Sequence, residues 1–336
     1  MGRINQEKGK KILVIRFSAI GDIVLTSPII RALKKSGYEV HYLVKGQFKS
    51  AIQNNQYIDK LFTLEEPHLK ECLRLEKYEM IIDLQNNLKS LKIRSGLSKD
   101  IRIVNKENLK KLVLVRTGLD LLNREHIVDR YFKTIENTGA KNDGKGLDFY
   151  LIDDFRLAPN KTECSIEQTY IAWVIGASYP KKTLPAEHII QTCNVLKIPV
   201  LLVGGAQDEK KGAKIVSAAI GKNVHNLCGK LSLEESAFVV KKSSLVLSND
   251  TGLMHIAAAY QKDIISFWGC TKPSLGMFPY KPGTRSKEMI SPSQKAPCSK
   301  LGNRCKSDKN GCIQHIKVND IILEIKKVLP EGLERL

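Results

Sequence analysis

The residue types best suited to chemistry follow an apolar run at 244–248. Asn249 and Asp250 tolerate unusual dihedral angles, and Gly252 lacks a Cβ atom, so together these residues suit a tight turn. The small and apolar residues after Gly252 are typical of a helix packed closely against a sheet. A strand, a turn and a helix start direct unpaired backbone N–H groups to the carboxyl edge of a sheet, which is a natural seat for a phosphate.

Two more side chains of this stretch, Thr251 and His255, lie four residues apart. On a helix they share a face and could reach the same anion. Capping of the helix by Asp250 or Thr251, with His255 as an ordinary, partly buried histidine, explains the same pattern. The stretch taken alone leaves both interpretations open.

A second group of polar residues follows the apolar run at 11–16, which is typical of a central parallel strand. The next loop carries Ser18, Gly21 and Asp22 at the expected carboxyl end of that strand, where open α/β sheets bind ligands. Asp22 could cap the helix that we expect over 23–35, or it could accept a proton from a hydroxyl nucleophile. The loop lacks the Gly-x-Gly-x-x-Gly fingerprint of dinucleotide binding, which disfavours a nicotinamide or flavin cofactor.

Apolar runs alternate with helical patterns along the whole chain, which predicts an α/β protein built from two doubly wound halves. Glycine and proline make the pattern irregular between 137 and 168, so we expect domains at 1–160 and 161–336. The last helix, at 318–329, could pack back on the first domain. Two such halves facing each other would form a central cleft. The expected strands lie at 11–16, 39–44, 78–83, 170–175, 199–203, 224–228, 244–248 and 263–268.

Composition and hydropathy are those of a soluble globular protein, with 42% hydrophobic and 26% charged residues. No apolar run approaches the roughly 20 residues that a helix needs to cross a bilayer. The start of the chain, at 1–11, is charged, and the short apolar run after it lacks a convincing cleavage site for a signal peptide. We therefore expect a cytoplasmic protein.

The charge balance implies an anionic partner, because 54 Lys and Arg stand against 35 Asp and Glu and the net charge is +19. Residues 89–116 hold nine basic and two acidic side chains, and residues 281–309 hold eight and two. A generally lysine-rich chain with solvated basic faces is the alternative. No aromatic residues are interleaved with these basic ones, so a nucleic-acid partner is disfavoured.

The eight cysteines include no Cys-x-x-Cys pair. Cys298, Cys305 and Cys312 recur every seven residues in a stretch that we expect to be a loop. Zinc sites usually show closer pairs, and a reducing compartment disfavours disulfides. The sequence therefore favours thiols that simply pack, and it predicts no metal.

Three motifs, in order along the chain, together resemble glycosyltransferase family 9, the ADP-heptose:lipopolysaccharide heptosyltransferases. The resemblance covers roughly residues 11–329 and implies the GT-B arrangement of two Rossmann-like domains with the active site between them. One departure is Leu184, where the family usually has Trp. The motifs are Ser-Ala-Ile-Gly-Asp at 18–22 with Leu-Thr-Ser-Pro at 25–28, Ile-Asp-Leu-Gln at 82–85 with Lys89 and Ser90, and Asp-Thr-Gly-Leu-Met-His at 250–255 followed by Gly-Cys-Thr-Lys-Pro at 269–273.

This resemblance implies an inverting, metal-independent transfer of heptose from ADP-heptose to a sugar hydroxyl of a lipopolysaccharide core precursor, with no cofactor. Asp22 matches the general base, and Lys182 matches the lysine that contacts the donor pyrophosphate. Arg16 would add positive charge near the leaving group, and Glu209 matches an acidic residue that holds the nucleoside. The other residues expected to bind the donor are Ser18, Gly21, Asp250, Thr251, Gly252 and His255.

On the acceptor side, Gln85, Lys89 and Ser90 follow an expected strand end, where polar groups suit a hydroxyl-rich substrate. The basic segments fit docking to an anionic glycolipid on the inner face of the bacterial inner membrane. Two alternatives remain: a related transferase that uses another nucleotide sugar for a different surface glycan, and a basic binding protein of the same fold without activity.

Overall fold

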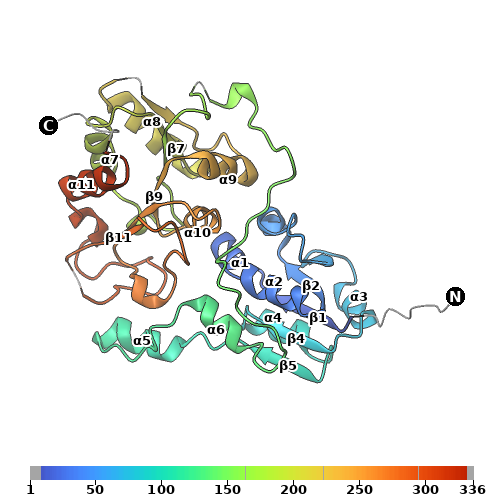
Figure 1. Cartoon of the computed structure of the whole chain (residues 1–336). Coiled ribbons are helices and arrows are strands. Elements are labelled where there is room, and N and C mark those ends of the chain that lie inside the picture. The colour runs from blue at the N-terminus through green and yellow to red at the C-terminus, as the bar shows by residue number, and fades with distance from the viewer. Residues whose placement is uncertain (1–8, 163, 222, 294, 331–336) are drawn as a thin grey trace. The chain divides into compact units, whose positions relative to one another are not determined.

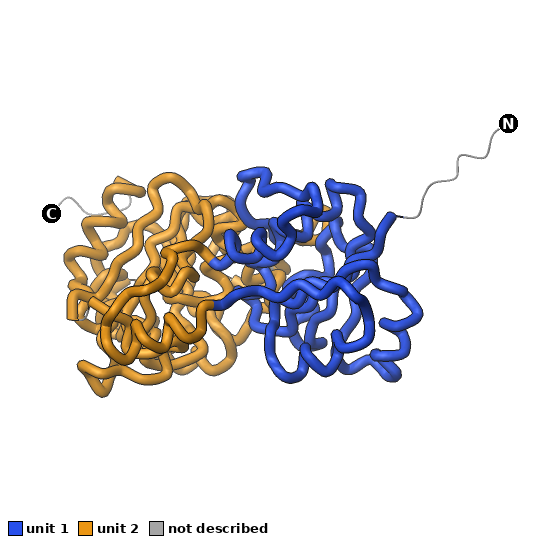
Figure 2. Tube along the Cα trace, turned by 90° about the horizontal axis from the view of Figure 1, so that it is seen from below, with its two compact units in different colours: residues 1–106, 127–150 blue, residues 107–126, 151–336 orange. Residues whose placement is uncertain are grey.

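The computed structural model describes residues 9–162, 164–221, 223–293 and 295–330 (Figure 1). The charged residues before 9, on which the expectation of no signal peptide partly rests, lie outside these ranges. The chain forms two compact units, which are coloured separately in Figure 2. The first unit contains residues 1–106 and 127–150, and the second contains residues 107–126 and 151–336. The division therefore falls at 150 rather than 160, and residues 107–126 belong to the second unit.

The first unit is built on a five-stranded parallel sheet with the order β3-β2-β1-β4-β5. Central strand β1 is buried almost throughout, as its apolar run predicts. Because all five strands are parallel, their carboxyl ends lie along one edge, and the strand order reverses between β1 and β4. The strands are β1 (Lys11–Ile15), β2 (Glu39–Val44), β3 (Lys60–Thr63), β4 (Met80–Asp83) and β5 (Asp100–Ile103).

The helix expected over 23–35 is divided into α1 (Ile20–Val24) and α2 (Ser27–Lys35). At the division the hydroxyls of Thr26 and Ser27 donate to the carbonyls of Ile23 and Val24, at 2.7 Å each. Proline has no N–H group to donate, so Pro28 fits the first turn of a new helix better than the interior of a longer one. The other helices of this unit are α3 (Leu69–Leu75), α4 (Leu88–Arg94) and α6 (Ile127–Lys133).

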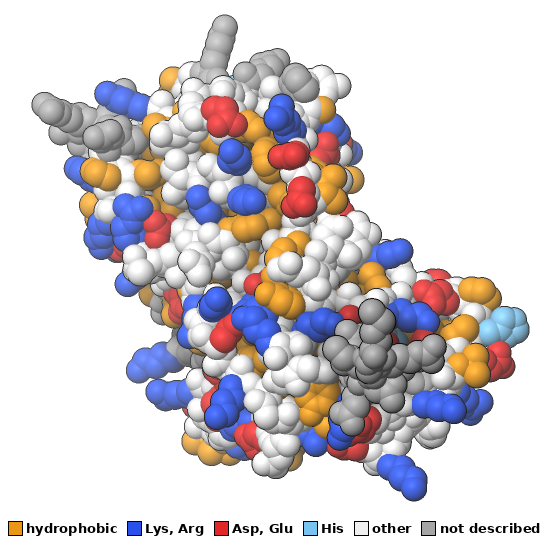
Figure 3. Space-filling view, turned by 45° about the vertical axis from the view of Figure 1, so that its right-hand side comes forward, with side chains coloured by type: hydrophobic (Ala, Val, Ile, Leu, Met, Phe, Trp, Pro, Cys, Tyr) orange, Lys and Arg blue, Asp and Glu red, His pale blue; other side chains and the backbone are white. Residues whose placement is uncertain are grey.

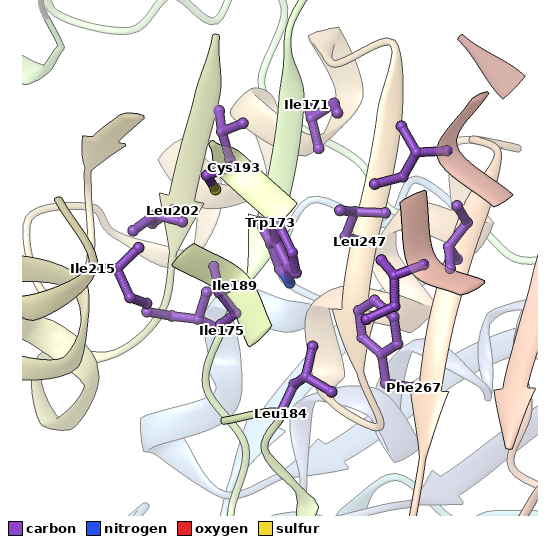
Figure 4. Packing of buried hydrophobic residues seen from close by; sticks show 14 of the residues in the cluster. Ile171, Trp173, Ile175, Leu184, Ile189, Cys193, Leu202, Ile215, Leu247 and Phe267 are labelled. Atoms are coloured by element: carbon purple, nitrogen blue, oxygen red, sulfur yellow. The ribbon is translucent and has the colours of Figure 1, made fainter. Parts of the chain in front are cut away.

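The second unit contains a six-stranded parallel sheet with the order β11-β10-β9-β6-β7-β8. Side chains from one face of this sheet form a large core, in which Trp173 and Phe267 lie near Ile171 and Leu247 (Figure 4). The strands are β6 (Ile171–Val174), β7 (Val200–Val203), β8 (Val224–Asn226), β9 (Leu245–Asn249), β10 (Ile264–Trp268) and β11 (Lys287–Ile290).

Helices lie on both faces of this second sheet (Figure 1). The last helix, α11, packs against α7 and adds Ile321, Ile325 and Val328 to the core of the second unit. This apolar stripe completes the core of its own sheet, so the helix belongs to the second unit. Its packing on the first domain stays a prediction. Among the described residues, no helix is both long and apolar enough to cross a bilayer. The helices of this unit are α5 (Asn108–Thr117), α7 (Ala186–Cys193), α8 (Glu209–Ala218), α9 (Leu233–Lys242), α10 (Gly252–Ala259) and α11 (Val318–Val328).

Candidate functional site

The turn between β9 and α10 has the strand, turn and helix start that the sequence predicts. Thr251 is the N-cap of α10, and its hydroxyl oxygen accepts a hydrogen bond from the Met254 N–H at 3.4 Å. Gly252 is the first residue of the helix, so the N–H groups of its first turn point to the carboxyl edge of the sheet. His255 is buried, with 2% of its surface exposed, as the alternative of an ordinary buried histidine predicts. Its role in donor binding stays a prediction.

Lys182 lies beside this turn. It ends a short 3₁₀ turn, Pro180–Lys182, and its Nζ atom is 2.6 Å from Oδ2 of Asp250. The same carboxylate oxygen accepts a hydrogen bond from the Thr271 hydroxyl at 3.0 Å. The side chains of Lys182 and Asp250 are only 12% and 15% exposed. The structure therefore holds an ammonium group, a carboxylate and the amino end of α10 together.

Asn249 organises the two loops of this site, a role that its position in a turn did not reveal. Its side-chain oxygen accepts from the Leu184 N–H at 3.1 Å, and its amide nitrogen donates to the carbonyls of Val174 and Gly176. The buried amide thus ties the end of β9 to the loop that carries Lys182. Leu184, where the family pattern has Trp, is fully buried in the core.

A third loop follows β7. Its predicted ligand, Glu209, is exposed at the first position of α8. The neighbouring Asp208 is buried, accepts the Gly205 N–H at 2.9 Å, and has a pKa raised by that burial. Lys211 donates to the carbonyls of Leu184 and Ile175, and burial lowers its pKa to about 8. The helical pattern around Lys211 gave no sign that this lysine turns inward.

In the first unit, Asp22 lies in the first turn of α1, as its interpretation as a helix cap predicts, and its role as a base stays a prediction. One carboxylate oxygen accepts the Ala19 N–H at 3.3 Å, and the other is 2.7 Å from Nη2 of Arg16. Burial disfavours the charge on Arg16, but the Asp22 carboxylate together with Tyr131 and Tyr42 offsets this, and the Arg16 pKa is raised. Arg16 also donates to the carbonyls of Ser18 and Leu84, so it joins the loops after β1 and β4.

Of the remaining residues of this loop, Ser18 is half-buried and Gly21 is buried within α1. Both belong to the first unit, whereas the predicted donor contacts from Glu209 to His255 belong to the second.

The predicted acceptor residues differ in accessibility. Gln85 is half-buried, and its side-chain oxygen accepts the Phe17 N–H at 3.0 Å. Lys89 is exposed on α4. Ser90 is fully buried, because its hydroxyl donates to Asp83 at 2.7 Å and takes part in the capping of α4. It can influence an acceptor only through the groups that it positions.

Asp83, from the Ile-Asp-Leu-Gln motif, is the centre of this loop. Its buried carboxylate accepts the N–H groups of Gln85 and Asn86 at 2.9 and 2.7 Å, and it forms an ion pair with Arg94. The two polar loops at the reversal of strand order are therefore fixed by buried charges rather than left free in solvent.

Parts of the two basic segments meet in the second unit. A pocket of about 640 Å³ lies between α5 and residues 298–306, and no acidic side chain lines it. On the face drawn in Figure 3, by contrast, Lys and Arg side chains are mixed with acidic ones. The mixture of charges on that face marks no anion-binding site, whereas the side chains that line the pocket concentrate positive charge. The basic lining residues are Lys111, Arg116, Lys300, Arg304 and Lys306.

The three regularly spaced cysteines also come together. The sulfur atoms of Cys298, Cys305 and Cys312 lie within 4.8 Å of one another and of a fourth, Cys270. Cys270 follows β10, and the sequence gave no reason to group it with the other three.

Comparison with known proteins identifies the family of this chain. The model of glycosyltransferase family 9 (heptosyltransferase) matches residues 67–308. Lipopolysaccharide heptosyltransferase 1 of Campylobacter coli is 26% identical, over 95% of this chain and 98% of the relative.

Two solved structures share the fold. The family 9 glycosyltransferase of Veillonella parvula superposes with a TM-score of 0.77 at 18% identity, covering 96% of this chain and 98% of the other. The Escherichia coli heptosyltransferase WaaC with ADP gives a TM-score of 0.70 at 19% identity, covering 95% and 99%. Two parallel-sheet α/β domains of the GT-B type, as the resemblance implied, are thereby confirmed. Because the family model matches most of its length, the chain belongs to glycosyltransferase family 9, the heptosyltransferases.

Proposed function

We propose that this glycosyltransferase moves a heptose from ADP-heptose to a sugar hydroxyl of a lipopolysaccharide core precursor, with inversion at the transferred carbon. The observation that carries the proposal is the group formed by Lys182, Asp250 and the amino end of α10. A departing nucleoside diphosphate gains negative charge, which an ammonium group and aligned N–H groups stabilise without a divalent ion.

The donor is inferred from this geometry together with the relatives. The Campylobacter coli relative is a lipopolysaccharide heptosyltransferase, and ADP is the nucleotide in the Escherichia coli structure. Glu209 is exposed at the start of α8, at the carboxyl edge of the same sheet, where its carboxylate can accept from the hydroxyls of a ribose.

We assign the base to Asp22. In the transfer the acceptor oxygen forms a bond to the anomeric carbon, the bond from that carbon to the diphosphate breaks, and Asp22 takes the hydroxyl proton. The ion pair with Arg16 and the hydrogen bond from Ala19 hold the carboxylate in one orientation. The polar loop of Gln85 and Lys89, at the neighbouring strand end, supports a sugar acceptor.

The anionic character of the acceptor is supported by the basic pocket of the second unit. Its five Lys and Arg side chains suit the phosphate and carboxylate groups of a lipopolysaccharide precursor at a membrane surface.

A melting-temperature titration with ADP, UDP, GDP and ADP-heptose tests the donor. Ligand at about a hundred times its Kd stabilises the native state by about 2.7 kcal/mol, so ADP and ADP-heptose should raise the melting temperature by several degrees. Lys182→Met should weaken both shifts, and Lys181→Met, the neighbouring lysine, should not. A shift with UDP or GDP alone would support the related transferase with another nucleotide sugar.

Transfer itself is tested with ADP-heptose and lipopolysaccharide precursors that do or do not carry phosphate. We expect product with both and a lower KM for the phosphorylated precursor. Nucleotide binding without transfer to any glycan acceptor would contradict the proposed activity.

A further inference from the structure

Four cysteines of the second unit converge on one point from distant parts of the chain. The distances between sulfur atoms are 3.7 Å from Cys298 to Cys305, 4.0 Å from Cys298 to Cys312, and 3.8 Å from Cys312 to Cys270. Every pair lies within 4.8 Å. Cys270, Cys298 and Cys312 are buried and Cys305 is partly exposed.

These distances distinguish a disulfide, a cluster of several iron atoms and a single tetrahedral metal ion. A disulfide needs about 2.05 Å between its sulfur atoms, and none of the pairs approaches this. In clusters with several iron atoms the thiolates bind different irons, so their sulfur atoms lie further apart. A tetrahedron with zinc–sulfur bonds of about 2.3 Å has edges of about 3.8 Å, which matches these three distances.

We propose that Cys270, Cys298, Cys305 and Cys312 bind a single tetrahedral metal ion of the zinc type. The donor set is four thiolates, which suits Zn²⁺ or a mononuclear iron site. The four thiols lose their protons when they bind the ion, so the metal site as a whole carries a net negative charge.

The segment that carries three of these ligands has little regular secondary structure and few large apolar side chains. Between 291 and 311 the described residues form no helix or strand, and a stretch of this length without regular structure is uncommon in a compact domain. Leu301 is the one large aliphatic residue in this stretch, and it is 53% exposed. Hydrophobic packing of the segment is therefore limited to small residues such as Ala296, and a metal joining it to the loop after β10 would fix it further.

Groups around the sulfur atoms are arranged to stabilise thiolates. The sulfur of Cys305 lies 3.5 Å from the hydroxyl oxygen of Ser307, which can donate to a thiolate. Lys272, two residues after Cys270, is buried, and its ammonium group donates to the carbonyl of Ser291 at 3.0 Å. A polar donor and a nearby cation are groups that surround a bound metal thiolate site.

A second group of possible ligands lacks these properties. Glu39, His41 and Glu76 also lie within 4.8 Å of one another. Lys11 and Lys60 already pair with Glu76, at 2.5 Å each, so its negative charge is compensated without a metal.

The cysteine-bearing segment lies beside the donor-site lysine and the basic pocket, so an ion that holds the segment would act on both. Gly302 lies against Lys182, where a Cβ atom would collide with the lysine side chain, and a Cβ at Gly311 would lie 2.9 Å from the backbone oxygen of Lys181. The same segment supplies Lys300, Arg304 and Lys306 to the basic pocket. Fixing it therefore fixes the surroundings of Lys182 and one wall of the pocket.

The first experiment is metal analysis of the full-length protein, purified without chelators and without a polyhistidine tag. We expect one zinc or iron ion per chain, and binding of Co²⁺ to the metal-depleted protein should give the visible spectrum of a tetrahedral cobalt thiolate. Cys312→Ser and Cys270→Ser should lose most of the metal. Cys72→Ser, which changes an exposed cysteine outside the cluster, should retain it.

A second experiment needs no variant and so does not depend on their folding. A chelator should lower the melting temperature of the wild-type protein, and one equivalent of Zn²⁺ should restore it while Mg²⁺ should not. Failure of the fully reduced protein to bind Zn²⁺ would overturn the proposal. So would full metal content in both cluster variants, or a disulfide among the four cysteines in protein kept free of oxygen.

Discussion

Asp22 has a structural role in this fold, and we propose that it is also the general base of the transfer. Its carboxylate caps the start of α1 and pairs with the buried Arg16, and both contacts restrict its orientation. A general base must hold its oxygen within hydrogen-bond reach of the proton that it removes. The contacts that make Asp22 a helix cap are therefore also those that would position it for the proposed base role.

Replacing Asp22 with Asn tests this assignment. The Asn side chain can still accept the Ala19 N–H, but it cannot take the proton, so we expect transfer to fall by about 10²–10⁴-fold. Binding of ADP, measured by calorimetry, should change little. Asp59→Asn is the matched control, because Asp59 also pairs with a lysine and accepts a backbone N–H in the first unit. Full transfer activity in Asp22→Asn would exclude the base role.

At the scale of elements, the carboxyl edge and the amino edge of the first sheet carry different kinds of polar residues. The candidate site lies at the carboxyl edge, whereas Glu76 lies at the amino edge, between the first residues of β1 and β3. Hydrogen bonds from Lys11 and then Lys60 lower the Glu76 pKa to about 2, and His41 of β2 adds to the effect. This carboxylate ties three neighbouring strands and touches none of the predicted ligand residues.

Glu76 should therefore contribute stability that depends on pH. Its pKa is lower in the folded state than its ordinary value of 4.5, so the contribution is present above 4.5 and disappears as the pH falls toward about 2. Glu76→Gln should melt at a lower temperature than the wild type at pH 7, and the gap should close over that range. Glu71→Gln, at an exposed carboxylate of α3, should show no such gap. A gap that is independent of pH would mean that Glu76 acts through packing rather than charge.

At the scale of the whole molecule, the chain does not complete one unit before it begins the other. After β5 it contributes residues 107–126 to the second unit and then returns to the first for α6. Leu114 and Leu122 of this excursion pack with Leu275 in a small cluster of the second unit. The excursion also supplies two basic residues of the pocket, Lys111 and Arg116.

Leu114→Ala tests whether residues 107–126 are held by their packing in the second unit. Loss of the buried side chain should cost about 2–5 kcal/mol, and the lower values are expected because the cluster is small. Hydrogen exchange should then rise in residues 107–126 and around Leu275. Leu112→Ala, at a half-exposed position of the same helix, is the control. Faster exchange confined to the first unit would contradict the assignment of α5 to the second.

The sequence by itself determined the alternation of strands and helices and the loops that carry the site. Buried parallel strands are continuous apolar runs, and turn residues such as those at 249–252 have local preferences, so both can be recognised without the rest of the chain. Strands β3, β5 and β11 were not predicted, because they are short, partly polar edge strands with a weak pattern.

Only the tertiary structure decided which distant residues meet. Cys270 joins three cysteines that lie at least 28 positions later, Asp83 gathers the groups of its own loop, and α5 belongs to the second unit. No local preference encodes such contacts, because they depend on how the sheets order their strands and on which buried surfaces remain to be covered. The pairing of Lys182 with Asp250 is of the same kind: the sequence indicated each residue separately, and the fold brought the two charges to 2.6 Å.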